Sequence, residues 1–343
     1  MAQTPITELV DPEALGRYLD AQLGVKEDLQ LEAHVAGFSN VTCFVTRNGV
    51  EYVLRRPPAG PLLPTAHDVA REHRFLAALA DTAARVPRPT LLCEDDSVIG
   101  APFYLMERKH GHVIRHDMPT VLDNPADRRR IGFEMIDALV EIHAVDWQAA
   151  GLTSRRATEY LDRQLARWNT QAGLTVGKVR ELPELVAVGE WLAQEKPESG
   201  APTVVHGDFK LDNVMFAPES PTRLIGVFDW EMATIGDPLA DLGWLMHTWG
   251  RPEHVPDDAV LPLTAQAGFA SRDELAARYA EKTGRQMARF DWYHVLALWK
   301  LAIILEGLYV HYRTGTASNP GAAAFEIQVP ALIRRAQALI DAV

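Results

Sequence analysis

Oxygen-bearing side chains gather in one stretch of this 343-residue sequence. Asp208 follows the apolar pair 204–205 and a His-Gly step, Asn213 comes five positions later, and Asp229 ends a second apolar run, 225–228. Carboxylate and amide oxygens are the ligands that a hard cation such as Mg²⁺ prefers. We therefore interpret this stretch as a phosphoryl-transfer site, since that reaction uses a metal beside the phosphates.

The spacing of these residues favours a phosphoryl-transfer site over two other interpretations. Asp and Asn beside strands are often turn residues that only cap the backbone. A metal-dependent phosphohydrolase could use His206 and the two aspartates, but it would leave Lys210 and Asn213 without a role. The series His206-Gly-Asp208-x-Lys210-x-x-Asn213, followed by a strand and Asp229, fixes five positions together. That spacing matches a kinase catalytic loop and its metal-binding aspartate.

Composition excludes several classes of protein. A net charge of -12 argues against nucleic acid as a partner, because phosphate backbones are bound by excess Lys and Arg. An acidic balance would suit a cationic substrate, although solubility explains it equally well. Cys43 and Cys93 lie fifty positions apart with no partner motif, so we expect neither a disulfide framework nor a zinc site. A reducing cytoplasm is the expected location.

Membrane association is not expected either. Residues 1–8 lack the basic and apolar regions of a secretory signal. The most apolar segment, 293–310, is interrupted by His294, Lys300 and Glu306, which favours a buried helix over a membrane span.

The first hundred residues predict a small lobe. Asp11-Pro12-Glu13 is typical of a helix start. A strand pattern follows from 29 to 54, and Asn48-Gly49 between alternating apolar residues predicts a hairpin. Two further strands, 90–93 and 101–106, and a helix over 66–80 complete five strands around one internal helix.

This lobe carries four candidate nucleotide contacts. Ser39 and Asn40, after Gly37, could offer backbone N–H groups to phosphates, but the loop lacks a GxGxxG or Walker pattern and could be a simple turn. Arg55 ends the third strand as a solvated charge or as the kinase cation that reaches the phosphates, which is normally lysine. Glu72 could pair with neighbouring arginines on the surface or with Arg55.

Beyond a polar linker at 107–111, the chain is largely helical. We expect helices over residues 125–145, 157–171, 183–195, 237–249, 271–283, 289–313 and 321–342. Trp244 and Lys300 lie in two of these helices. Aromatic and mixed residues at helical spacing belong to the core more often than to a site, so core packing is the expectation for both.

These motifs resemble the aminoglycoside phosphotransferase and choline-kinase-like superfamily. Within it the chain is most similar to the kinase-like domain fused to some acyl-CoA dehydrogenases. The resemblance rests on six phrases, at 37–40, 52–58, 71–72, 104–108, 206–213 and 228–238. It implies an α+β, bilobal protein-kinase-like fold, with a five-stranded antiparallel nucleotide-binding N-lobe over 1–107 and a helical C-lobe over 108–343 that holds the acceptor.

The resemblance also implies a role for each motif residue. Asp208 would be the catalytic base, and Lys210 would contact the transferred phosphoryl group. Asn213 and Asp229 would bind Mg²⁺. His206 would support the loop, and Asp241 would brace it from the following helix.

The remaining implied roles concern the nucleotide. Arg55 stands where the family has lysine and would pair with Glu72, and the loop at Ser39 and Asn40 would meet the phosphates. The hinge backbone from Glu107 to Lys109 would meet the base.

The resulting hypothesis is a small-molecule kinase that transfers the γ-phosphate of ATP or GTP to a hydroxyl group. Similarity to the subfamily suggests a hydroxyacyl-CoA acceptor, and the wider superfamily suggests an aminoglycoside-type antibiotic. A nucleotide-binding pseudokinase is the alternative, because Arg55 and the sparse glycine loop depart from the usual pattern. Acidic residues lining the acceptor site would favour amine acceptors, whereas basic and apolar residues lining it would favour acyl-CoA. The sequence does not place these lining residues or give the oligomeric state.

Overall fold

The N-lobe is built on one antiparallel sheet, seen in a computed structural model that describes residues 6–24, 26, 28–34, 40–58, 68–250, 261–316 and 320–343. Its strand order is β1-β2-β3-β5-β4. The strands are β1 (Leu29–His34), β2 (Val41–Arg47), β3 (Val50–Arg56), β4 (Pro89–Cys93) and β5 (Phe103–Glu107). Asn48 and Gly49, both with positive φ, form the turn between β2 and β3. The predicted sheet and hairpin are confirmed.

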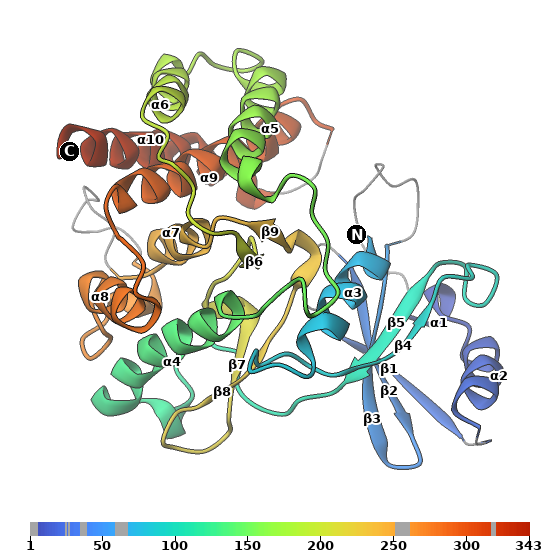
Figure 1. The fold of residues 1–343 in the computed structure, drawn as a ribbon. Coiled ribbons are helices and arrows are strands. Elements are labelled where there is room, and N and C mark those ends of the chain that lie inside the picture. Colours follow the sequence, from blue (N-terminus) through green and yellow to red (C-terminus); the bar gives the residue numbers. More distant parts are fainter. Residues whose placement is uncertain are drawn as a thin grey trace.

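Helices cover both faces of this sheet (Figure 1). Helices α1 (Ile6–Leu9) and α2 (Pro12–Leu23) cover one face, where Leu15 and Leu19 pack with buried strand residues. Helix α3 (Val69–Leu79) lies between the other face and the C-lobe and shares their core. The helix predicted over 66–80 has Asp68 as its N-cap, while Ala66 and His67 lie outside the described residues.

The C-lobe is organised around α9 (Phe290–Arg313), which packs against its neighbours in the helical layer (Figure 1). The other helices are α4 (Pro125–His143), α5 (Tyr160–Thr175), α6 (Pro183–Gln194), α7 (Leu239–Thr248), α8 (Arg272–Thr283) and α10 (Phe325–Asp341). Among the described residues, α9 is the one helix long and apolar enough to cross a membrane, but 61% of its most apolar window is buried within the molecule. It forms the core of the lobe, as the sequence predicts.

Two short antiparallel strand pairs position the oxygen-bearing residues of the motif. Strand β6 (Thr203–Val205) pairs with β9 (Thr234–Gly236), and β7 (Val214–Phe216) pairs with β8 (Leu224–Val227). The loop from β6 to β7 contains Asp208 and Asn213, and the segment from β8 to β9 begins near Asp229. Because the strand pairs pack in the same core, the two segments meet.

Two arginines of the N-lobe, Arg71 and Arg85, bind C-lobe segments next to the strands that carry the site. Arg85 donates to both carboxylate oxygens of Glu141 on α4 at 2.7 Å, and to the Leu224 carbonyl at 3.1 Å. Arg71 on α3 donates to the carbonyls of Glu231, at 3.2 Å, and Ala233. These contacts hold the N-lobe against the strands that carry the site.

Candidate active site

The side chain of Asp208 is held in one orientation by its neighbours. Trp244 Nε1 donates to Asp208 Oδ1 at 2.7 Å, and Asn213 Nδ2 donates to Oδ2 at 2.8 Å and to the Asp208 carbonyl at 2.9 Å. Lys210 Nζ lies 3.1 Å from Oδ2. The carboxylate is only partly buried. Both of its oxygens are thus oriented while the group stays accessible to a substrate.

The backbone before Asp208 is braced from α7. Asp241 accepts hydrogen bonds from the amides of His206, at 2.6 Å, and Gly207, at 2.7 Å. Burial raises the pKa of Asp241, but the hydrogen bond with His143 and the Gly207 amide outweigh burial, so its pKa lies below the ordinary value. His206 Nε2 lies 2.8 Å from the Phe228 carbonyl and links the two loops. Asp241 and His206 therefore occupy the supporting positions that the sequence predicts.

Gly207 can only be glycine in this loop. Its φ is +85°, in the left-handed region where side chains are strained. A Cβ atom at this position would also lie 2.9 Å from both the Cβ and the carbonyl oxygen of Met232. The absence of a side chain lets the catalytic loop pass against the segment that follows Asp229.

Asp229 and Arg55 connect the lobes within the site. Asp229 has φ 64° and ψ 61°, a left-handed conformation that is uncommon outside glycine and often occurs at functional sites. Its Oδ1 lies 3.5 Å from Arg55 Nη2, while Arg55 Nε lies 3.2 Å from Oε2 of buried Glu72. Burial lowers the pKa of Arg55, but Glu72 and Asp229 raise it more. Glu72 thus pairs with Arg55, not with the surface arginines of its own helix.

The donor set fits a divalent metal bound together with phosphates. Asn213 directs its amide nitrogen to Asp208, which leaves the amide oxygen for a cation. Asp229 supplies a partly exposed carboxylate. Within the described residues, no group of three or more His, Cys, Asp or Glu side chains could hold a metal alone. This agrees with Mg²⁺ sites that use one or two protein ligands and complete the shell with water and phosphate.

The other predicted nucleotide contacts lie in the loop at Ser39 and Asn40 and at the hinge. Ser39 lies outside the described residues, and Asn40 is buried. At the hinge, the Glu107 amide donates to the Arg88 carbonyl at 2.9 Å, and the Glu107 carboxylate pairs with Lys109. The Glu107 amide is therefore engaged within the protein.

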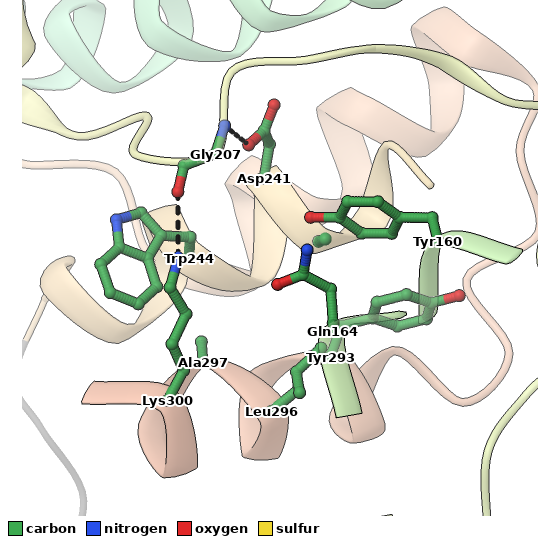
Figure 2. Close-up of a pocket in the computed structure, with 10 residues that line it drawn as sticks. Tyr160, Gln164, Gly207, Asp241, Trp244, Tyr293, Leu296, Ala297 and Lys300 are labelled. Atoms are coloured by element: carbon green, nitrogen blue, oxygen red, sulfur yellow. Dashed lines mark hydrogen bonds between the residues drawn. The ribbon is translucent and has the colours of Figure 1, made fainter. Parts of the chain in front are cut away.

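Trp244 and Lys300 contact the catalytic loop, although the sequence favours plain core packing for both. Figure 2 shows Lys300 reaching from α9 to the Gly207 carbonyl, at 3.1 Å, beside the Trp244 ring. Its Nζ lies 3.9 Å from the centre of that ring. Burial lowers the pKa of Lys300 to about 8, with Asp208 opposing the shift. The position of Trp244 three residues after Asp241, on the same helix face, is the signal that could have identified it.

The bilobal fold and this constellation define a protein-kinase-like phosphotransferase. Residues 30–293 match the model of the phosphotransferase enzyme family, and the chain belongs to that family. It is 33% identical to acyl-CoA dehydrogenase family member 10 of Mus musculus over 91% of this chain, and 33% identical to family member 11 of Homo sapiens over 90%. The chain spans 30% of the length of the mouse protein and 40% of the human protein.

Solved structures show the same fold. A Ralstonia eutropha protein provisionally titled an aminoglycoside phosphotransferase superposes with a TM-score of 0.82 and 31% identity, covering 96% of this chain and 98% of that one. An aminoglycoside 2'-phosphotransferase in complex with GDP has a TM-score of 0.58 at 14% identity, covering 96% of this chain and 99% of that one. The family resemblance is confirmed: the chain is a kinase-like phosphotransferase.

Proposed function

We propose that this protein is a cytoplasmic small-molecule kinase that transfers the γ-phosphate of ATP or GTP to a hydroxyl group of a metabolite, with Mg²⁺ as cofactor. The observation that carries the proposal is the Asp208 carboxylate, oriented by Trp244 and Asn213. The amide of Phe228, which directly precedes Asp229, donates to the Asn213 carbonyl at 2.9 Å and joins the two loops. Structural neighbours were solved with GDP, and with ADP and hygromycin B. These complexes support a nucleotide and a hydroxylated acceptor as the two substrates.

The reaction assigns one task to each residue of the site. The acceptor oxygen forms a bond to the γ-phosphorus, the bond from that phosphorus to the β–γ bridging oxygen breaks, and the nucleoside diphosphate leaves. Asp208 accepts the hydroxyl proton. Lys210 lies close enough to Asp208 to contact the transferred group. Mg²⁺ held by Asn213 and Asp229 would neutralise charge on the phosphates.

The acceptor that we propose is a hydroxyacyl-CoA or a similar hydroxylated metabolite. This proposal is supported by the 33% identity with part of two acyl-CoA dehydrogenase family members. Both of these relatives are much longer than this chain. An aminoglycoside acceptor is suggested by the description of the Ralstonia eutropha neighbour at 31% identity, while the other aminoglycoside phosphotransferases lie below 25% identity and establish the fold alone.

The test is acceptor-dependent ADP release with Mg-ATP in the wild type and in Asp208→Asn. Losing the base should lower kcat by about 10² to 10⁴, because general-base catalysis contributes about that factor. Asp212→Asn is the matched control, since Asp212 lies in the same loop with an exposed side chain. Removing Mg²⁺ with EDTA should abolish turnover.

Two results would contradict the proposal. Unchanged turnover in Asp208→Asn would show that the carboxylate is not the base. Nucleotide binding without transfer to any hydroxylated acceptor would assign the protein to the pseudokinases.

A further inference from the structure

A cationic pocket opens beside the catalytic loop. Its volume is about 310 Å³. It is lined by Arg71, Tyr160, Arg163, Gln164, Arg167, Gly207, Met232, Thr234 and Lys300, and none of these is acidic. Gly207 directly precedes Asp208, so the pocket borders the group that accepts the hydroxyl proton.

Two of the arginines have no carboxylate partner among the described residues, and one of them, Arg167, lies over the Trp168 ring, 5.2 Å from its centre. Arg163 and Arg167 are one turn apart on α5 and therefore project from the same face. In the described part of the chain neither forms an ion pair, and the neighbouring Asp162 pairs instead with Lys196. Other helix arginines of this protein do find carboxylates, as Arg278 does with Asp137 at 2.7 Å. Arg163 and Arg167 lack such a carboxylate partner within the described ranges.

The other two cations are fixed in place but keep their charge. Arg71 is held by backbone carbonyls of the segment after Asp229, and Lys300 by the Gly207 carbonyl. A carbonyl orients a cation without neutralising it. Because a concave surface lined by one sign of charge concentrates its potential, these four side chains form an anion-attracting site in a chain of net charge -12.

We propose that this pocket is the subsite for an anionic group, a phosphate or a carboxylate, carried by the acceptor. The proposal rests on the proposed kinase function and specifies its substrate class. The pocket shares Tyr160, Gln164, Gly207 and Lys300 with a smaller cavity that Trp244 also lines (Figure 2). An anion bound by the arginines keeps the rest of the acceptor next to the catalytic loop, whereas a polycationic antibiotic is repelled.

The test measures binding, so it does not depend on turnover. Protein saturated with Mg²⁺ and a non-hydrolysable ATP analogue, which keeps probe phosphates out of the nucleotide site, is titrated calorimetrically with three probes. Coenzyme A carries phosphates, pantetheine lacks them, and 3-hydroxybutyrate carries a carboxylate. We expect an anionic probe to bind, and the double variant Arg163→Gln/Arg167→Gln to bind it at least about tenfold more weakly, since charge-assisted hydrogen bonds are lost.

Controls separate this site from general charge effects. Arg130→Gln removes one arginine charge at an exposed position of α4, which matches the single variant Arg167→Gln, and should bind like the wild type. If the double variant does not fold, Arg167→Gln alone, at an exposed position, serves in its place. Binding of coenzyme A without pantetheine identifies a phosphate group, and binding of 3-hydroxybutyrate identifies a carboxylate.

The subsite is refuted if neither anionic probe binds the saturated wild type, or if the double variant binds as tightly as the wild type. Weaker binding of the ATP analogue alone in the double variant would assign the arginines to the nucleotide and would also refute it. These outcomes differ from failure of the kinase function, which shows as unchanged turnover in Asp208→Asn.

Discussion

The two halves of the active site differ in charge and in how the chain builds them. The proposed phosphoryl-donor half consists of Asp208, Asn213 and Asp229, which are acidic or amide side chains beside two short antiparallel strand pairs. The acceptor half is the cationic pocket, drawn from α3, α5, α9 and the segment around β9. One half offers oxygen ligands to a metal, and the other offers N–H donors to an anion.

This difference predicts a division of labour that kinetics can test. Changes in the donor half should lower turnover with every acceptor, because metal and base serve any hydroxyl group. Changes in the acceptor half should alter acceptor KM according to charge. The predictions below run from the largest expected effect to the smallest.

Asp229→Asn should have the largest effect. Loss of a metal-ligating carboxylate should lower kcat/KM by more than about 100-fold at limiting Mg²⁺, since mutating outer-shell partners alone typically costs about 10- to 100-fold. Initial rates over a Mg²⁺ series measure the effect, with Asp212→Asn as control. If the loss of kcat/KM depended on the charge of the acceptor, the proposal that the donor half serves every acceptor alike would be contradicted.

Trp244→Phe should lower kcat by about tenfold or more, because it removes a hydrogen bond to a charged group that is worth about 1.5–3 kcal/mol. KM for nucleotide and acceptor should change little, since Trp244 Nε1 contacts only the Asp208 carboxylate. Trp249→Phe is the matched control. It also removes a hydrogen bond from a buried indole, which donates to the Ala270 carbonyl away from the site. Equal kcat losses in both variants would show that Trp244 acts only through packing.

A pH effect at Lys300 should be the smallest. Burial lowers its pKa to about 8, with Asp208 and Asp241 opposing the shift and Arg167 and Lys210 adding to it. Lys300 is therefore charged below pH 8 and loses its charge above it. The KM for an anionic acceptor should rise severalfold as the pH passes through about 8, as steady-state rates can show. The same rise in Lys300→Gln would exclude this lysine as the titrating group.

The donor half was predictable because its residues are close in sequence. Asp208, Lys210 and Asn213 lie within six positions, and short apolar runs flank them. The hydrogen bond between Asn213 and Asp208 lies within that loop, so local spacing determines it. The Asn48-Gly49 turn was predictable for the same reason, as the positive φ values of a tight hairpin select those residues.

Interactions between helices were less predictable. Lys300 lies 93 positions from Gly207 and Trp244 lies 36 from Asp208, so no local pattern links either pair. Both side chains belong to apolar helices, in which core packing is the common outcome. The bond from Trp244 depends on how α7 is docked, which is a property of the assembled core.

The sequence by itself determined the reaction class, because the catalytic motif is a set of neighbouring residues whose roles follow from side-chain chemistry and spacing. Only the tertiary structure decided which side chains face the acceptor. Arg163 and Arg167 look like an ordinary solvated helix face until α5 is placed beside Arg71 and Lys300. Long-range packing sets that arrangement, because the pocket exists only when three helices distant in sequence meet at one loop.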